Sequence, residues 1–324
     1  MSEPTADYEI RPFREGDELA IEQGFERAFG KRRSAGEWAW KFPEVEGRRT
    51  IEIARDATGA LAAHYAAVPV RMRRPERDFL AGQVVDVFTL QKRGLFRRAG
   101  LLTRTIDAFL RTFCGAGGIE LLFGFPSLRA AALGQATEVY PVTAPAPRHR
   151  RRPDGAERPL GFSRFVSEGF DAAALDRLWR RSAPRYAWSA VRDADWHRHR
   201  FLARPGGGYR HLIVRQAGEP RAAAVLRAEG ARLLWVDLVW DGRSVEDLAL
   251  LESEVRRRGR AAGAEEVELW LGGDVEAATA LAALGWPEEA HPDLVLVVRS
   301  LVADAGHEEI AERLYFTLAD SDLA

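Results

Sequence analysis

The residues with the clearest chemical meaning form an arginine-rich turn that follows an apolar stretch. Arg93 stands next to Gly94, and Arg97 and Arg98 follow after Leu95 and Phe96. An amphipathic helix is predicted to begin near Gly94. The first N–H groups of a helix lack intrahelical partners, and the helix dipole makes this end attractive to anions. Because arginine pairs well with phosphate, the pattern predicts a phosphate or pyrophosphate site.

A second set of residues could move protons. Asp86 lies in an apolar stretch just before the arginine-rich turn, and burial there is expected to raise its pKa toward that of a general base. Asp237 occupies the equivalent position in the second half of the chain, so a structural role is the alternative interpretation. Glu120 is a further candidate and has a similar partner in Glu268.

The elements that must position these residues follow from hydrophobic periodicity and turn signals. In the first half, strands are expected at 8–13, 50–56, 61–72, up to 90 and at 119–125, with helices at 15–29 and 94–113. In the second half, strands are expected at 209–215, 222–228, 233–240, 266–271 and 294–299, with helices at 172–181, 245–262 and 275–284. This order predicts a mixed α/β sheet flanked by helices in each half.

The chain also repeats itself. Val85-Asp86-Val87 recurs as Val236-Asp237-Leu238, and Leu133-Gly134 recurs as Leu284-Gly285, each 151 positions later. Trp38 and Trp196 lie in similar segments and are expected to occupy the same place in two copies of one unit. The predicted domains are 1–143 and 160–301, with a Pro- and Arg-rich linker at 144–159 and a C-terminal extension at 302–324.

The segment from Gln83 to Pro126 resembles the coenzyme A-binding segment of GNAT-type N-acetyltransferases, in particular bacterial members with two domains in tandem. The shared features are Gln83, Asp86, Thr89, Arg93-Gly94-Leu95-Phe96 and Gly124-Phe125-Pro126. The turn is shorter than the family pattern, and Phe96 stands where a small residue is usual. The resemblance implies two tandem GNAT-like acyl-CoA N-acyltransferase domains built on a mixed α/β sheet.

The resemblance further implies that the first domain binds acetyl-CoA or coenzyme A. The implied contact residues are Val87, Phe88, Thr89, Arg93, Gly94, Leu95, Phe96, Arg97 and Arg98. The acyl group would go to an amine on a small molecule, a sugar or a peptide. The tyrosine that the family often uses as general acid is replaced by Ala130 and Leu281. Tyr140 or Tyr65 could substitute for it, and the alternative interpretation is that each is an ordinary half-buried aromatic residue.

Two other functions remain open from the sequence. The shortened turn and the missing tyrosine also fit a catalytically inactive GNAT-like scaffold, and an altered turn fits a transferase with a different acyl donor. The second copy is expected to bind no coenzyme A, because its turn carries Asp241 and Ser244. Ser244 would cap the next helix and compete with a phosphate, and Glu246 and Asp247 would repel an anion.

Composition narrows the class of protein. The 324 residues include 47 basic and 48 acidic side chains, a balance that favours neither nucleic acid nor an anionic membrane. The run Arg148–Arg152 could touch RNA, but a solvated linker is the other interpretation. The single cysteine, Cys114, excludes an intrachain disulfide and fits a reducing cytosol. No signal peptide, membrane span or metal site is predicted, so a cytoplasmic protein is expected.

Overall fold

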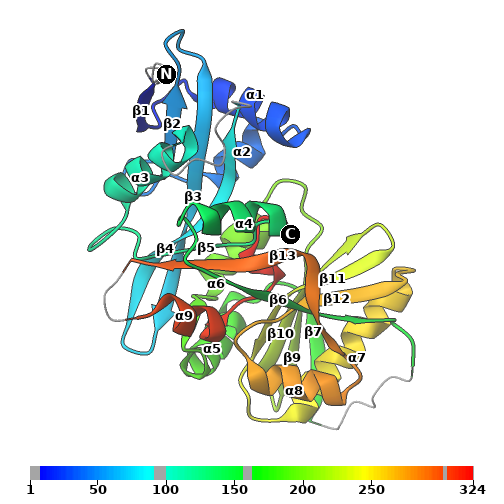
Figure 1. Cartoon of the computed structure of the whole chain (residues 1–324). Coiled ribbons are helices and arrows are strands. Elements are labelled where there is room, and N and C mark those ends of the chain that lie inside the picture. Colours follow the sequence, from blue (N-terminus) through cyan, green and yellow to red (C-terminus); the bar gives the residue numbers. More distant parts are fainter. Residues whose placement is uncertain (1–7, 91–99, 156–162, 302–304, 324) are drawn as a thin grey trace. The chain divides into compact units, whose positions relative to one another are not determined.

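The computed structural model describes residues 8–90, 100–155, 163–301 and 305–323, which fall into two compact units (Figure 1). The first unit comprises Met1–Arg71, Phe79–Ala144 and Asp293–Ala311, and the second comprises Met72–Asp78, Pro145–Pro292 and Glu312–Ala324. Each unit contains a sheet with both parallel and antiparallel pairs, flanked by helices. The predicted mixed α/β class is therefore confirmed.

The first unit orders its strands β1-β2-β3-β4-β5-β13, in which β4 and β5 are parallel while β13 runs antiparallel to β5. Most of its elements lie within two residues of the predicted bounds. The elements are β1 (Glu9–Pro12), α1 (Glu18–Phe29), α2 (Ala35–Lys41), β2 (Ile51–Arg55), β3 (Leu61–Arg74), β4 (Arg77–Thr89), α3 (Leu101–Phe113), β5 (Leu121–Gly124) and α4 (Leu128–Ala136).

Two hydrophobic clusters cover the two faces of this sheet. Ile21 and Phe25 of α1 pack with Trp38 and Phe42 of α2 against one face. On the other face, Phe109 of α3 lies edge-on to Tyr65 of β3 at 4.8 Å between ring centroids. Figure 1 accordingly shows α1 and α2 on the opposite side of β2 and β3 from α3. The alternating faces of the strands thus place α1 and α2 together and α3 apart from them.

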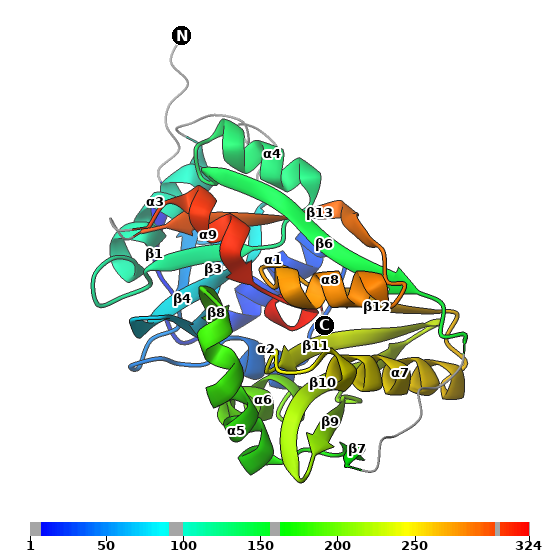
Figure 2. The same cartoon turned by 90° about the horizontal axis from the view of Figure 1, so that it is seen from below.

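The second unit has the strand order β6-β12-β11-β10-β9-β7, in which the β11–β12 pair is parallel and the other pairs along this order are antiparallel. Figure 2 shows α7 lying along β10. The elements are β6 (Val142–Arg151), β7 (Arg164–Glu168), α5 (Ala172–Ser182), η1 (Ala183–Arg185), β8 (Trp188–Ala190), α6 (Ala194–His197), η2 (Arg198–Leu202), β9 (Arg210–Gln216), β10 (Glu219–Glu229), β11 (Arg232–Trp240), α7 (Val245–Ala261), β12 (Glu266–Trp270), α8 (Val275–Ala283) and β13 (Glu288–Ser300). The chain then continues with α9 (His307–Arg313), β14 (Leu314–Tyr315) and η3 (Leu318–Asp320).

The stretch predicted as a linker is largely a strand. β6 pairs antiparallel with β12, and its arginines are bound by glutamates rather than left in solvent. Arg150 lies 2.5 Å from Glu289, and Arg151 lies 3.2 Å from Glu252. Prolines and arginines suggested a linker because neither side chain builds an apolar core, but this strand is stabilised by ion pairs to Glu289 of β13 and Glu252 of α7 instead. In the run considered for RNA binding, Arg148, Arg150 and Arg151 are thus paired with glutamates, whereas Arg152 is exposed.

Three smaller expectations also differ from the structure. The helix predicted from Gly94 begins at Leu101, with Gly100 as its N-cap. Leu133-Gly134 lies inside α4, whereas Leu284-Gly285 follows the end of α8, so this sequence match does not mark equivalent places. The C-terminal extension is not separate from the fold, because residues 314–321 are buried in the second unit.

Candidate active site

The central feature of the first unit is a parallel strand pair that separates. β4 pairs with β5 at only three positions, Ala81 with Leu121 through Gln83 with Phe123. Beyond Gln83, β4 continues through Val84 to Thr89. This separated region, the first wedge, leaves the β5-facing edge of β4 without a strand partner among the residues that the structure describes. Backbone groups at such an edge can bind an extended ligand.

Asp86 lies in the wedge at a point where the strand is distorted. Its φ of 52° falls in the left-handed region, which a non-glycine residue adopts only under structural constraint. Nδ1 of His64 lies 2.7 Å from the backbone oxygen of Asp86. Burial lowers the pKa of His64 to about 4, so the neutral ring donates from Nδ1 to this oxygen. The histidine therefore holds the bulge of β4 in place.

The carboxylate of Asp86 is held by two cations. Lys41 Nζ lies 2.8 Å from Oδ1, and Arg33 binds Oδ2. Burial alone would raise the pKa of Asp86, but the charges of Lys41 and Arg33 outweigh it and lower this pKa. The expected direction was wrong, because the sequence did not reveal that two cations from the α1–α2 region reach the strand.

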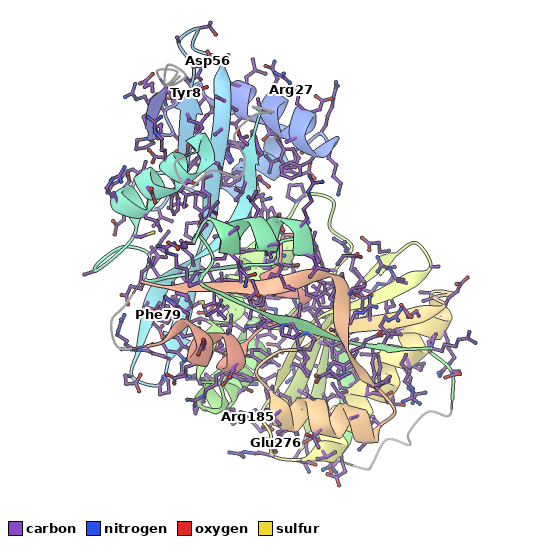
Figure 3. All side chains as sticks on the ribbon, in the orientation of Figure 1. Tyr8, Arg27, Asp56, Phe79, Arg185 and Glu276 are labelled. Carbon is purple, nitrogen blue, oxygen red and sulfur yellow. The ribbon has the colours of Figure 1, made fainter. Side chains whose placement is uncertain are left out.

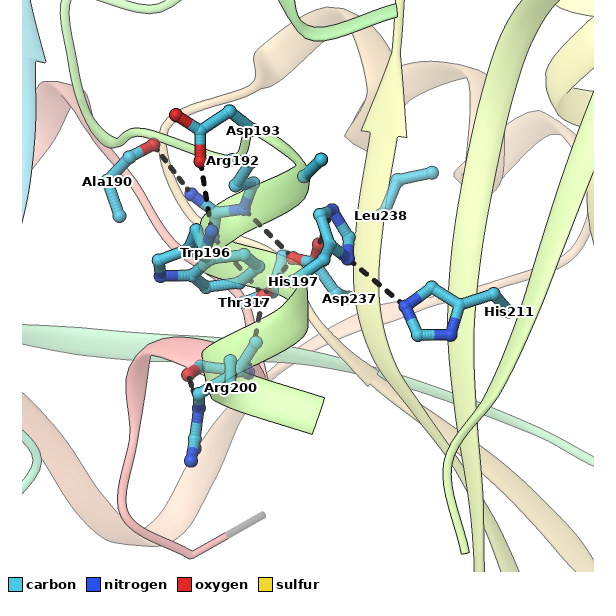
Figure 4. A network of polar contacts seen from close by, with 12 residues as sticks. Ala190, Arg192, Asp193, Trp196, His197, Arg200, His211, Asp237, Leu238 and Thr317 are labelled. Carbon is cyan, nitrogen blue, oxygen red and sulfur yellow. Dashed lines mark hydrogen bonds and ion pairs between the residues drawn. The ribbon is translucent and has the colours of Figure 1, made fainter. Parts of the chain in front are cut away.

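The second unit repeats this ion pair (Figure 4). Arg192 Nε lies 2.9 Å from Oδ1 of Asp237, and both side chains are fully buried. Arg33 immediately precedes Ser34, the N-cap of α2, and Arg192 immediately precedes Asp193, the N-cap of α6. Both units therefore use an arginine before a helix cap to bind an aspartate in the corresponding strand.

These helix caps also give an alignment of the two units. Ser34 accepts from Glu37 N–H, and Asp193 accepts from Trp196 N–H at the same spacing. Counting from the caps pairs Trp38 with His197, one residue away from the predicted match with Trp196. The two tryptophans were matched in the sequence because tryptophan is rare. The helix caps give the structural alignment, because they mark where each helix begins.

Tyr140 lies at the point where β4 and β5 separate. With Tyr65 it lines a narrow crevice beside Val84 of β4 and Phe123 of β5. Burial raises the pKa of Tyr140 to about 12, so its hydroxyl stays protonated at neutral pH. The ring packs against Gly134, where any side chain would collide with it. Tyr140 thus keeps a protonated hydroxyl at the apex of the wedge.

Two other reactive side chains lie elsewhere. Glu120 precedes β5 at its paired end, where its backbone N–H donates to Leu80 O at 2.9 Å, so the structure does not bring it to Tyr140. Burial raises the pKa of Cys114 to about 12, which keeps it a thiol rather than a nucleophilic thiolate. Among the residues that the structure describes, no group of acidic, histidine or cysteine side chains is arranged to hold a metal ion.

The predicted cofactor contacts divide into two groups. Val87, Phe88 and Thr89 all lie in the separated part of β4. Phe88 stacks on His64 at 5.1 Å and Thr89 Oγ1 donates to Ala62 O at 3.1 Å, so these residues would face a ligand mainly through their backbone. The remaining six fall within 91–99, outside the described residues: Arg93, Gly94, Leu95, Phe96, Arg97 and Arg98.

Sequence reasoning missed the residues that begin α3. Gly100, the N-cap, has no side chain to accept the free N–H groups, and the first turn contains no acidic residue. No side chain among the described residues caps this helix start, which contains the N–H groups of Leu101 and Leu102, and a helix start of this kind can bind an anion. The second glycine after the arginines, followed by two leucines, was the signal that could have identified this start.

The corresponding turn of the second unit is already occupied by side chains. A Cβ on Gly242 would lie 2.6 Å from Nε of Arg185, and Nη1 of Arg185 donates to Trp240 O at 2.7 Å. Arg185 and Glu276 meet at 3.0 Å (Figure 3). Ser244 is the N-cap of α7 but makes no side-chain cap, contrary to expectation, because Arg164 and Glu246 bind its hydroxyl.

A buried carboxyl group in β2 predicts a pH-dependent stability for the first unit. Burial raises the pKa of Glu52 from 4.5 to about 7, and Arg111 offsets this only in part. The folded state then holds a proton that the unfolded chain releases, so stability is full below pH 4.5 and falls as the pH rises through 7. We expect a loss of up to about 3 kcal/mol across this window, and Glu52→Gln should abolish it.

Urea unfolding of the full chain at pH 5 and pH 8 measures this difference. Glu15→Gln, at an exposed position near α1, is the matched control. Its free energy of unfolding should change between the two pH values as in the wild type. An unchanged pH dependence in Glu52→Gln would show that another group causes it.

The comparisons with known proteins agree with this geometry. Residues 9–132 match the family of acetyltransferase (GNAT) domains, and the match includes the whole of the first wedge. No curated protein matches the chain significantly. None of the helices in the described ranges is long and apolar enough to cross a membrane.

Solved structures share the fold along almost the whole chain. A probable N-acyltransferase from Enterococcus faecalis has a TM-score of 0.67 at 9% identity, covering 92% of this chain and 73% of that one. A GCN5-related N-acetyltransferase from Anabaena variabilis has a TM-score of 0.66 at 11% identity, and the match covers 91% of this chain and 73% of that one. A GCN5-related N-acetyltransferase from Kribbella flavida has a TM-score of 0.61 at 14% identity, and the match covers 92% of this chain and 72% of that one. The chain thus has the fold of GCN5-related N-acetyltransferases.

Proposed function

We propose that the protein transfers an acyl group, in the first instance acetyl, from coenzyme A to an amine, with the first unit as the catalytic one. The observation that carries the proposal is the first wedge, where β4 parts from β5 with Tyr140 at its apex. A thioester arm that enters the wedge would lie along the unpaired edge of β4. Backbone N–H groups there would stabilise the negative charge that develops on the thioester oxygen.

The anionic end of coenzyme A would bind at the start of α3. The N–H groups of Leu101 and Leu102 point out of an uncapped helix end, where a pyrophosphate is stabilised by hydrogen bonds and by the helix dipole. The arginines of the preceding turn, Arg93, Arg97 and Arg98, would add charge. We also propose that Gly94, Leu95 and Phe96 contact coenzyme A.

Tyr140 would protonate the leaving thiolate. A hydroxyl whose pKa is raised to about 12 remains a donor at neutral pH, and its ring is fixed against Gly134. Asp86 has a different role in this proposal. Its carboxylate is bound by Arg33 and Lys41, so it positions the β4 bulge and the α1–α2 region rather than accepting a proton.

A direct test follows the free thiol of coenzyme A while acetyl-CoA is offered with a panel of amines. The panel should include small diamines, amino sugars and peptides with a free N-terminus. Thiol release that requires both acetyl-CoA and one amine class would support the proposal. Binding of acetyl-CoA without thiol release for any amine would favour a binding protein on the same fold.

Tyr140→Phe and Asp86→Asn separate catalysis from structure. Tyr140→Phe keeps the ring but removes the proton, so kcat should fall about 10- to 100-fold with the melting temperature unchanged. Asp86→Asn tolerates the left-handed backbone but loses both ion pairs, so the melting temperature should fall while the shape of the pH–rate profile is retained.

Tyr65→Phe and Asp237→Asn are the matched controls. Tyr65 shares the crevice with Tyr140, so its hydroxyl tests whether any phenol there serves equally well. Asp237→Asn should lower the melting temperature without touching the first unit. If Asp86→Asn stays folded at the assay temperature and has no turnover, Asp86 is the base and its structural assignment fails.

A further inference from the structure

The second unit contains a wedge of the same kind as the first. β11 pairs with β12 from Arg232 with Glu266 to Trp235 with Leu269, and then continues to Trp240 paired with β10 but not with β12. The helix after this wedge, α7, also begins without a side-chain cap, but its first turn carries the acidic residues Glu246 and Asp247, whereas the first turn of α3 carries none. What lies in the second wedge is therefore a separate question from the function of the first.

The second wedge is filled by the chain's own residues 314–321. Phe316 forms an antiparallel bridge with Gly272, just beyond β12, with Gly272 N–H to Phe316 O at 3.0 Å and Phe316 N–H to Gly272 O at 3.2 Å. On the other wall, the Tyr315 hydroxyl donates to Leu238 O of β11. The segment therefore touches both strands that separate, as a bound extended ligand would.

Two glycines have no room for a side chain because of this segment. A Cβ at Gly272 would collide with the ring of Phe316, and a Cβ at Gly273 would collide with the backbone oxygen of Leu314. The φ of Gly273 is +69°, which also favours glycine at this position. The two glycines thus let the segment pack closely against this wall of the wedge.

Two buried arginines fix the segment in place. Arg192, which binds Asp237 of β11, also binds Asp320, and Thr317 Oγ1 donates to Asp237 at 2.8 Å (Figure 4). Arg200 donates from Nε to Ala319 O at 2.7 Å and from Nη2 to Ser321 O. A buried carboxylate or carbonyl left without these donors would be costly, so the arginines hold the segment in the wedge.

We infer that residues 314–321 are a built-in occupant of the second wedge, which keeps the second unit closed to any external ligand. Tyr315 stacks on Tyr186 at 3.9 Å between ring centroids, so the occupant completes the hydrophobic core of the unit as well. In the second unit, residues 314–321 thus take the place that a ligand would occupy in an open wedge. This inference does not depend on the reaction proposed for the first unit.

Hydrogen exchange on the full chain, read by mass spectrometry, tests the inference. In the wild type, 314–321 should exchange as slowly as β11. Asp320→Ala removes one anchor, so exchange in 314–321 and in both walls, 236–240 and 270–273, should rise about tenfold or more. Faster exchange in 314–321 with both walls unchanged, or rapid exchange of this segment in the wild type, would overturn the proposal.

Two further arms keep the result clear if Asp320→Ala folds poorly. Glu312→Gln, two residues before the segment and exposed, should leave all three regions at the wild-type rate. Acetyl-CoA added to the wild type should not slow exchange at 236–240, because the occupant remains in place. Protection of 236–240 by acetyl-CoA would overturn the proposal, whereas protection at 84–89 concerns only the first unit.

Discussion

Gly100→Asp is expected to remove most of the affinity for coenzyme A while leaving the protein as stable as before. Gly100 has φ −69° and ψ 162°, an extended conformation that any residue adopts without strain. An aspartate there would accept the free N–H groups of the first turn and add negative charge at the positive end of the helix. We expect the Kd for acetyl-CoA to rise about tenfold or more.

Gly100→Ser is the matched control, because serine also caps the helix but carries no charge. Calorimetry should give an intermediate Kd for Gly100→Ser, and thermal unfolding should show both variants at or slightly above the wild-type melting temperature. An unchanged Kd in Gly100→Asp would place the pyrophosphate elsewhere and remove α3 from the account.

Arg192→Met is expected to cause the largest loss of stability. Arg192 is fully buried between Asp237 and Asp320, and its removal leaves two carboxyl groups without their cation. Burial raises the pKa of Asp237, and in the absence of Arg192 the group would have to be protonated or hydrated. Losses of about 3–5 kcal/mol are typical when one partner of a buried ion pair is deleted.

Arg33→Met in the first unit provides the comparison within the same chain. Asp86 would keep Lys41 at 2.8 Å, so the carboxylate retains one cation and the loss should be about 1–3 kcal/mol. Urea unfolding of both variants measures the difference. Equal losses would show that the second cation contributes nothing, and the duplicated ion pair would then need another explanation.

Hydrophobic periodicity predicted the longer elements well because they are long enough to show the pattern, whereas the short helices α2 and α4 were not predicted. In the second half, α7 was predicted at 245–262 and observed as Val245–Ala261, and β11 was predicted at 233–240 and observed as Arg232–Trp240. The local sequence pattern did not predict β6, because its arginines are paired with Glu289 and Glu252, which lie far away in sequence. Contacts of this kind form only in the folded protein and cannot be predicted from the sequence of one segment.

The candidate site was predicted in part for the same reason. Asp86 was correctly identified as buried, but its pKa depends on Arg33 and Lys41, about fifty residues earlier in the chain, and these pairings cannot be read from spacing. Tyr140 was named as a possible replacement acid, and its position at the apex of the wedge supports that hypothesis. The occupant of the second wedge was not foreseen, because a C-terminal extension with no clear periodicity gives no sign of where it binds.

The most direct test of the account is calorimetric titration of the full chain with acetyl-CoA. The acyl donor is proposed to bind in the first wedge, and the second wedge is filled by residues 314–321, so the account predicts saturation at one acetyl-CoA per chain. Two equivalent sites per chain would contradict the closed second unit. No binding at all would contradict the assignment of the first unit as the acyl donor site.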